Sequence, residues 1–147
     1  LQCRMPLESW MVKALFALKA GQLEEFRKML TSFLAGISYS MRRKDSEPER
    51  ERYFHYTFYL LLRLMSVYTV LVEKEQSEGR VDCIVETPQY VYIFEFKLDG
   101  TAADALRQIE EKGYARPYES DARRLYKVGV NFSSKTGTVE GWECRRR

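Results

Sequence analysis

The chain has 147 residues, of which 45% are hydrophobic and 31% are charged, and its formal net charge is +3. This length and composition predict one globular domain, or a domain with a short extension, that can bury a substantial core. The sequence has no apolar run near the ~20 residues of a membrane-spanning helix, and no signal-peptide pattern opens it. The small positive charge does not by itself indicate nucleic-acid binding.

The cysteine and histidine content restricts the chemistry further. Cys3, Cys83 and Cys144 lie far apart and form no CxxC pair, which favours reduced thiols and a cytoplasmic location over a disulfide framework or a zinc site. A single histidine, His55, excludes a histidine-rich metal site but could still serve as one ligand or as a base. Because the chain begins at Leu1 and not at Met, we expect it to be a piece of a longer protein.

The N-terminal part predicts a helical hairpin. Apolar residues recur at helical spacing over residues 7–20 and again over 22–35. Gly21 and Gly36 follow these two segments and are expected to end the helices. Residues 1–37 are therefore predicted to be an N-terminal helical extension whose apolar stripes serve packing.

A polar loop or linker is predicted at residues 38–48, followed by an α/β core at 49–147. Pro48 fits the first turn of a helix that continues to about residue 66. Glu51 lies near the start of this helix, where a carboxylate favours the positive end of the helix dipole.

The remainder alternates between strand and helix patterns. Strands are predicted at about 67–75, in a hairpin over 79–97, and at about 124–132 and 138–143. Between them, Thr101 begins a capping pattern for a helix that ends before Gly113. This order predicts an α/β fold with a central mixed β-sheet flanked by helices.

The hairpin carries charged residues within apolar runs. Glu95 and Lys97 are two residues apart, so they leave one face of their strand, and Phe94 and Phe96 leave the other. Asp82 joins Glu95 only if the two pair directly, and that register leaves Pro88 and Gln89 as the turn. Proline disfavours the positive φ of tight hairpin turns. We therefore expect a longer loop with a bulge, which would also place Asp82 and Glu95 on one face.

Two carboxylates at one place repel each other unless a cation lies between them. Oxygen ligands of this kind suit Mg²⁺ or Mn²⁺, which activate water and stabilise charge on a phosphoryl group. Lys97 could orient that water or offset negative charge. The alternative is that Glu95 and Lys97 form an ion pair on a solvent-exposed strand, with Asp82 a surface residue near the turn.

Residues 79–82, Gly-Arg-Val-Asp, followed by Glu95-Phe96-Lys97, resemble the motif of the PD-(D/E)XK nuclease superfamily. The wider stretch, with Tyr-Val-Tyr-Ile-Phe-Glu-Phe-Lys at 90–97 and Val-Gly-Val-Asn-Phe-Ser at 128–133, resembles the C-terminal nuclease-like domain of bacterial proteins with an N-terminal AAA-ATPase-like domain. Val81 stands where the motif has proline.

The resemblance implies metal binding by Asp82 and Glu95, with the carbonyl of Phe96 as a further ligand. It implies that Lys97 is the catalytic lysine. Glu51 matches the position of an additional acid from the helix before the sheet, and a simple helix-start acid is the alternative.

Two further residues match positions that some branches place after the lysine strand, Gln108 and Tyr114. Gln108 would take part in catalysis, with an exposed helix residue as the alternative. The spacing to Tyr114 departs from the shortest form of that pattern.

The expected function is metal-dependent hydrolysis of nucleic acid, with DNA favoured over RNA. The alternative is a catalytically silent nucleic-acid-binding or protein-binding module that regulates a larger ATPase-like protein.

Overall fold

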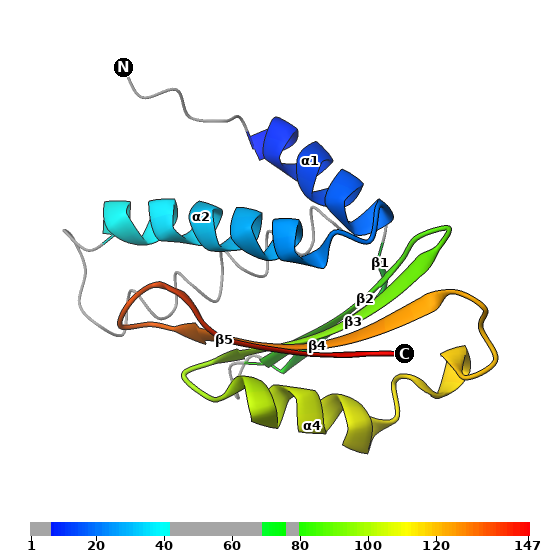
Figure 1. The fold of residues 1–147 in the computed structure, drawn as a ribbon. Coiled ribbons are helices and arrows are strands. Elements are labelled where there is room, and N and C mark those ends of the chain that lie inside the picture. Colours follow the sequence, from blue (N-terminus) through cyan, green and yellow to red (C-terminus); the bar gives the residue numbers. More distant parts are fainter. Residues whose placement is uncertain (1–6, 42–68, 76–79) are drawn as a thin grey trace.

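The computed structural model describes residues 7–41, 69–75 and 80–147. In these ranges the chain forms three layers, with helices α1 and α2 on one face of a sheet and helix α4 on the other (Figure 1). The expected α/β fold with a central mixed sheet flanked by helices is thereby confirmed. The helix predicted to run to about residue 66, with Glu51 and His55, lies outside the described residues.

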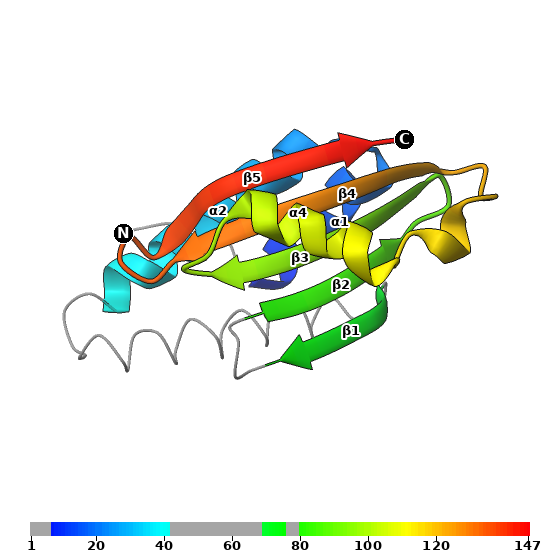
Figure 2. The same cartoon turned by 90° about the horizontal axis from the view of Figure 1, so that it is seen from below.

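The described sheet has five strands in sequence order. They are β1 (Thr69–Glu75), β2 (Arg80–Glu86), β3 (Tyr90–Leu98), β4 (Arg124–Ser133) and β5 (Thr138–Arg146). β3 and β4 run parallel, because α4 connects them, and the other neighbours are antiparallel. Figure 2 shows α4 lying against the sheet.

Helices α1 (Leu7–Lys19) and α2 (Leu23–Met41) meet at a tight turn. Gly21 has a φ of 73°, and the N–H groups of Gly21 and Gln22 donate to the carbonyls of Leu18 and Ala17. These are the two hydrogen bonds of a helix-ending motif that favours glycine. The prediction that Gly21 ends the first helix is thus confirmed.

The prediction that Gly36 ends the second helix is wrong. Helix α2 continues through Gly36 to Met41, and so includes the first residues of the predicted polar loop. Gly36 is not among the glycines with positive φ, which is the conformation that makes glycine a helix stop. The division into extension, linker and core stays a prediction.

The larger core cluster lies between the sheet and α1 and α2. Tyr92, Phe94 and Phe96 project from β3 into it, and the ring centroids of Phe26 and Phe94 are 5.5 Å apart. The buried Tyr92 hydroxyl donates to the carbonyl of Leu18 at 2.5 Å, which ties α1 to the sheet. Burial raises the pKa of Tyr92. None of the helices in the described part of the chain is long and apolar enough to cross a membrane.

Helix α4 (Ala102–Lys112) forms where local sequence signals predict it. The Thr101 hydroxyl accepts a hydrogen bond from the N–H of Asp104 at 3.0 Å, and Gly113, with a φ of 67°, caps the C-terminal end. Its buried residues recur at helical spacing and form one stripe, Ala102, Ala105, Leu106 and Ile109. Leu106 and Ile109 belong to the smaller core cluster. Its other buried members are Ile84, Val91, Ile93, Leu125 and Tyr118, the last of which lies in the short helix η3 (Arg116–Tyr118).

Gly129 in β4 allows α4 to lie close to the sheet. A Cβ atom at this position would lie 2.4 Å from the carbonyl oxygen of Ala102 and 2.7 Å from the amide nitrogen of Leu106. Both atoms belong to the backbone of α4. Because Gly129 pairs in register with Glu95, this close approach occurs directly beside the buried carboxylate of β3.

Candidate active site

The pairing of β2 with β3 places the two acids of the motif opposite each other. Asp82 pairs with Glu95, and Arg80 pairs with Lys97, without a register shift between the two strands. Directly opposite positions in an antiparallel pair share a face, so the Asp82 and Glu95 positions both lie on the face that α4 covers. The side chain of Asp82 lies outside the described part of the chain.

The turn that sets this register has two residues, Pro88 and Gln89, and the expected bulge is wrong. The N–H of Thr87 donates to the carbonyl of Tyr90 at 2.8 Å, and the N–H of Tyr90 donates to the Thr87 hydroxyl at 2.9 Å. In the described ranges only Asp99 among non-glycine residues has a positive φ. The Thr87 hydroxyl therefore closes the turn without the positive φ that proline forbids.

Arg123 braces the same turn from the chain that precedes β4. Its guanidinium donates to the Glu86 carboxylate at 2.7 Å and to the carbonyl of Thr87 at 3.1 Å. It also holds Asp121 at 2.6 Å. The hydrogen bonds from Arg123 lower the pKa of Asp121 to about 2. Arg123 thus joins the hairpin turn to the start of β4.

Glu95 is fully enclosed between β3 and α4. Its side chain is 0% exposed, whereas Lys97, nearer the end of the strand, is partly buried. Phe94 and Phe96 point to the opposite face, as their alternation with Glu95 and Lys97 predicts. The alternative of a solvent-exposed pair is therefore wrong for Glu95. A buried carboxylate requires compensation by cations or hydrogen-bond donors.

The loop after β3 packs along the stem of Lys97. The N–H of Gly100 donates to the buried Asn131 amide oxygen at 2.8 Å, and a Cβ at Gly100 would lie 3.1 Å from Lys97 Cδ. Asp99 accepts hydrogen bonds from the amide and hydroxyl of Ser134. Asn131 also pairs in register with Lys97. Two strands and one anchored loop thus confine the lysine.

The charge of Lys97 also reaches the first turn of α4. The pKa of Asp104 is lowered, mainly by hydrogen bonds from Arg107 and Thr101, with a smaller contribution from the Lys97 ammonium. The stem of Lys97 lies beside Gly100, two residues before α4 begins at Ala102, so Lys97 lies near the N-terminal end of α4, the end that favours anions.

Lys112 is the site residue that sequence reasoning missed. It is the last residue of α4, and its ammonium lies 3.9 Å from Oε1 of Glu95 and 5.5 Å from the ring centre of Tyr114. Gln108, half-buried, lies one helical turn before it. The four-residue spacing of Gln108 and Lys112 places both on one flank of the helix, but it does not indicate a contact of Lys112 with Glu95.

The remaining predicted ligands are only partly placed by the structure. Glu51 lies outside the described residues. Phe96 lies in β3 with its side chain buried in the larger cluster. Among the described side chains, no group of three His, Cys, Asp or Glu residues is close enough to hold a metal ion. The structure thus brings Glu95, Lys97 and Lys112 to one face and leaves the metal ligand set a prediction.

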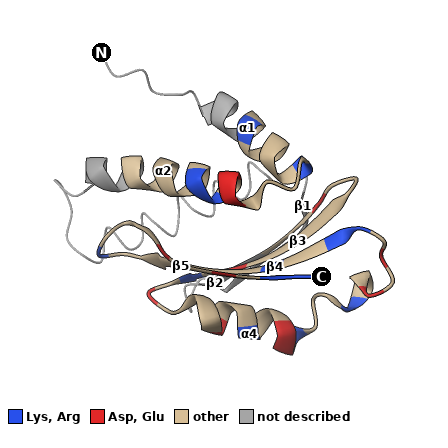
Figure 3. Ribbon diagram, viewed as in Figure 1, with Lys and Arg blue, Asp and Glu red and all other residues tan. Residues whose placement is uncertain are grey.

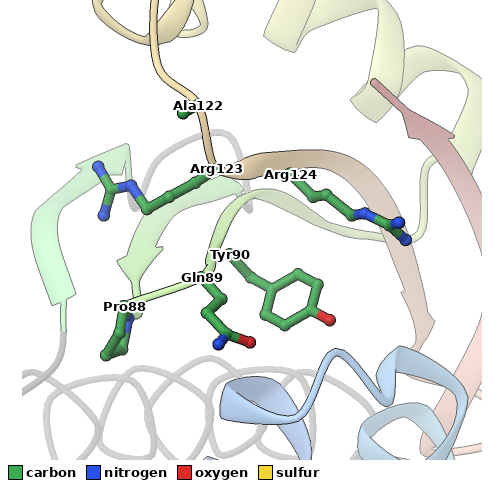
Figure 4. Close-up of a pocket in the computed structure, with 6 residues that line it drawn as sticks. All are labelled: Pro88, Gln89, Tyr90, Ala122, Arg123 and Arg124. Carbon is green, nitrogen blue, oxygen red and sulfur yellow. The ribbon is translucent and has the colours of Figure 1, made fainter.

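A separate depression lies at the turn end of the hairpin. Its volume is about 470 Å³, and its lining includes Tyr90, Arg123 and Arg124. The guanidinium groups of Arg123 and Arg124 point to opposite sides (Figure 4). Tyr90 and Glu95 are five positions apart along β3, so their backbones are separated by about 17 Å. This depression is therefore distinct from the site at Glu95, Lys97 and Lys112.

Charged residues of both signs are spread along the helices and strands (Figure 3). Several basic residues of the α4 side are held by acids. Lys127 contacts Glu110 at 3.0 Å, and Arg107 contacts Asp104 at 2.9 Å. This mixed surface agrees with the small net charge and does not by itself indicate a nucleic-acid partner.

Comparison with known proteins indicates the family of the chain. A family model of the PD-(D/E)XK nuclease superfamily matches residues 49–142, well over half of the chain. Among curated proteins, the chain is 31% identical over 127 residues to one from Azotobacter chroococcum mcd 1, described as an uncharacterised protein in the vnfD 5′ region. The match covers 85% of this chain and 24% of that relative. No solved structure matches the chain.

Proposed function

This chain belongs to the PD-(D/E)XK nuclease superfamily, and from that membership we propose that it hydrolyses phosphodiester bonds of nucleic acid at the Asp82, Glu95 and Lys97 site. The observation that carries the proposal is the direct pairing of Asp82 with Glu95 on the α4 face, where Glu95 is buried. Lys97 follows on the same face. Two acids and a lysine in this arrangement are what the superfamily motif requires.

Nucleases of this superfamily generally use divalent metals, and the donor set here fits one. Mg²⁺ and Mn²⁺ take oxygen ligands and are commonly held by one or two carboxylates with water and substrate phosphates completing the shell. Asp82 and Glu95 would hold the ion, with Glu51 and the Phe96 carbonyl as further proposed ligands. When bound, the ion would activate water and offset charge on the phosphoryl group.

The other residues would act on the substrate from the same face. The Lys97 ammonium, whose stem packs along the Gly100 loop, would orient the attacking water or neutralise charge that develops on the phosphate. Gln108 of α4 would contribute a polar contact to the reacting groups. The N-terminal end of α4, near Lys97, adds a positive helix-dipole end that favours a phosphate.

The finer points of the proposal follow the sequence resemblance. We propose DNA as the preferred substrate over RNA, a cytoplasmic location, and an N-terminal ATPase-like domain in the full-length protein. The chain spans about a quarter of the length of the curated relative it matches, 24%. The activity and partners of the whole protein are therefore part of the proposal.

The test is cleavage of single-stranded and double-stranded DNA and RNA with Mg²⁺ or Mn²⁺, and with EDTA in their place. Wild-type protein should cut DNA only with the metal. Glu95→Gln keeps the size of the buried side chain but removes its charge, and should lose at least about 100-fold of the rate. Melting of both proteins controls for folding.

Equal cleavage by wild type and Glu95→Gln would contradict the proposal, since it would place the activity elsewhere. Nucleic-acid binding that weakens steeply with salt, without any cleavage, would support the silent regulatory module instead.

A further inference from the structure

The contact of Lys112 with Glu95 joins a buried charge to a partly exposed one. The Glu95 side chain is 0% exposed and that of Lys112 is 26% exposed, and their charged atoms are 3.9 Å apart. A carboxylate removed from water is stable only when positive charge or donors compensate it. Lys112 contributes such compensation from α4, an element separate from the Glu95 strand.

Lys112 is the last residue of α4, where the helix end and a neighbouring ring both favour a cation. Gly113 ends the helix immediately after it, with its N–H bonded to the Glu110 carbonyl at 3.2 Å. A cation is favoured at this negative end of the helix dipole. The ring of Tyr114, 5.5 Å from the ammonium, offers a second favourable contact through its π face. In one position the ammonium thus contacts both the Glu95 carboxylate and the Tyr114 ring.

The contact itself is loose. Charge-assisted hydrogen bonds between ammonium and carboxylate are about 2.7–2.9 Å long. Lys127 and Glu110, on the same side of the sheet, are 3.0 Å apart, whereas Lys112 and Glu95 are 3.9 Å apart. The contact between Lys112 and Glu95 is thus an ion pair and not a short hydrogen bond.

We infer that Lys112 serves as an internal counter-ion of Glu95 in the metal-free protein and yields this place when Glu95 binds a divalent cation. The second half of this inference rests on the proposed function. The two cations would compete for one carboxylate, because like charges at such short separation repel each other in a buried site. Lys112 thereby stabilises the buried Glu95 charge before metal binding and lowers the affinity for the metal.

The first test is a double-mutant cycle in EDTA. Lys112→Met should lower the melting temperature by about 3–8 °C in the wild-type background. It should change the melting temperature by less than about 2 °C in a Glu95→Gln background, where no buried charge remains. Lys112→Arg keeps the charge and should stay within about 2 °C of wild type.

Lys127→Met is the matched control. It removes a lysine whose ion pair is shorter, 3.0 Å, but whose partner Glu110 is 40% exposed. If burial decides the effect, this variant should melt within about 2 °C of wild type. A larger loss for Lys127→Met than for Lys112→Met, or a Lys112→Met loss that persists in the Glu95→Gln background, would overturn the counter-ion role.

The second test is Mn²⁺ binding measured by calorimetry. Lys112→Met should bind Mn²⁺ about 3–10-fold more tightly than wild type, because no ammonium competes for Glu95. Lys112→Arg should bind as wild type does. Equal or weaker binding by Lys112→Met would overturn the exchange. No Mn²⁺ binding by wild type would overturn both the exchange and the proposed metal-dependent function, whereas the melting cycle would still decide the counter-ion role.

Discussion

Lys97→Met should reduce the rate of metal-dependent DNA cleavage by about 100- to 1,000-fold, the loss typical of removing one charged group from a reacting centre. Methionine keeps an unbranched stem that can pack beneath the Gly100 loop, whose Cβ position is 3.1 Å from Lys97 Cδ. The substitution therefore removes the ammonium with little change in packing. The measurement is the cleavage rate at saturating and at limiting DNA.

The separate effects of Lys97→Met on kcat and on KM identify the role of Lys97. If it acts on the reacting groups, kcat should fall while KM for DNA changes little. If it only attracts the phosphate backbone, KM should rise and kcat should stay constant. Lys127→Met is the control, because Lys127 lies on the α4 side of β4 and its ammonium is held by Glu110. Cleavage by Lys97→Met within threefold of wild type, at equal melting temperature, would contradict its assignment.

Gly129→Ala should lower the free energy of unfolding by about 2–3 kcal/mol, as overpacking against a rigid neighbour does. The added methyl would lie 2.4 Å from the Ala102 carbonyl oxygen and 2.7 Å from the Leu106 amide nitrogen, so α4 must move away from β4. Thermal melting should show a fall of about 5–10 °C. Because Glu95 lies beside Gly129 in the sheet, cleavage should also fall.

Gly36→Ala is the matched substitution on the opposite layer. Gly36 lies within α2, and a Cβ there meets none of the described atoms within 4 Å. Alanine in a helix interior is favoured over glycine by up to about 1 kcal/mol, so this variant should melt at or slightly above the wild-type temperature. Equal melting of both variants would contradict the close packing of α4 on the sheet.

Local signals predicted α4 well because they act within a few residues. Thr101 caps one end, Gly113 the other, and the buried stripe between them follows the helical period. Gly36 shows the limit of such signals. Glycine ends a helix only where the chain takes a left-handed conformation, and the sequence around Gly36 does not specify whether it does.

The register of the β2–β3 hairpin could not be predicted from the backbone preferences of its turn residues. Pro88 argues against a two-residue turn when only backbone conformations are considered. The hydroxyl of Thr87 accepts the N–H of Tyr90 and so closes the turn by a side-chain hydrogen bond. The family resemblance required the pairing of Asp82 with Glu95, and the strand register has it.

Lys112 could not be assigned to the site from sequence because its contact with Glu95 joins two elements. Predicting it requires the direction of α4 over β3 and the length of a lysine side chain, neither of which follows from helical periodicity. The faces of β3 needed only the alternation of a strand, and they were predicted correctly.

The central claim is that Asp82 and Glu95 together hold the catalytic metal. The most direct test is anomalous diffraction from crystals of the protein grown with Mn²⁺. A peak about 2.0–2.4 Å from a carboxylate oxygen of each residue is the predicted result. A fully occupied Mn²⁺ site elsewhere, with Glu95 still against Lys112 and no peak between the two acids, would contradict it.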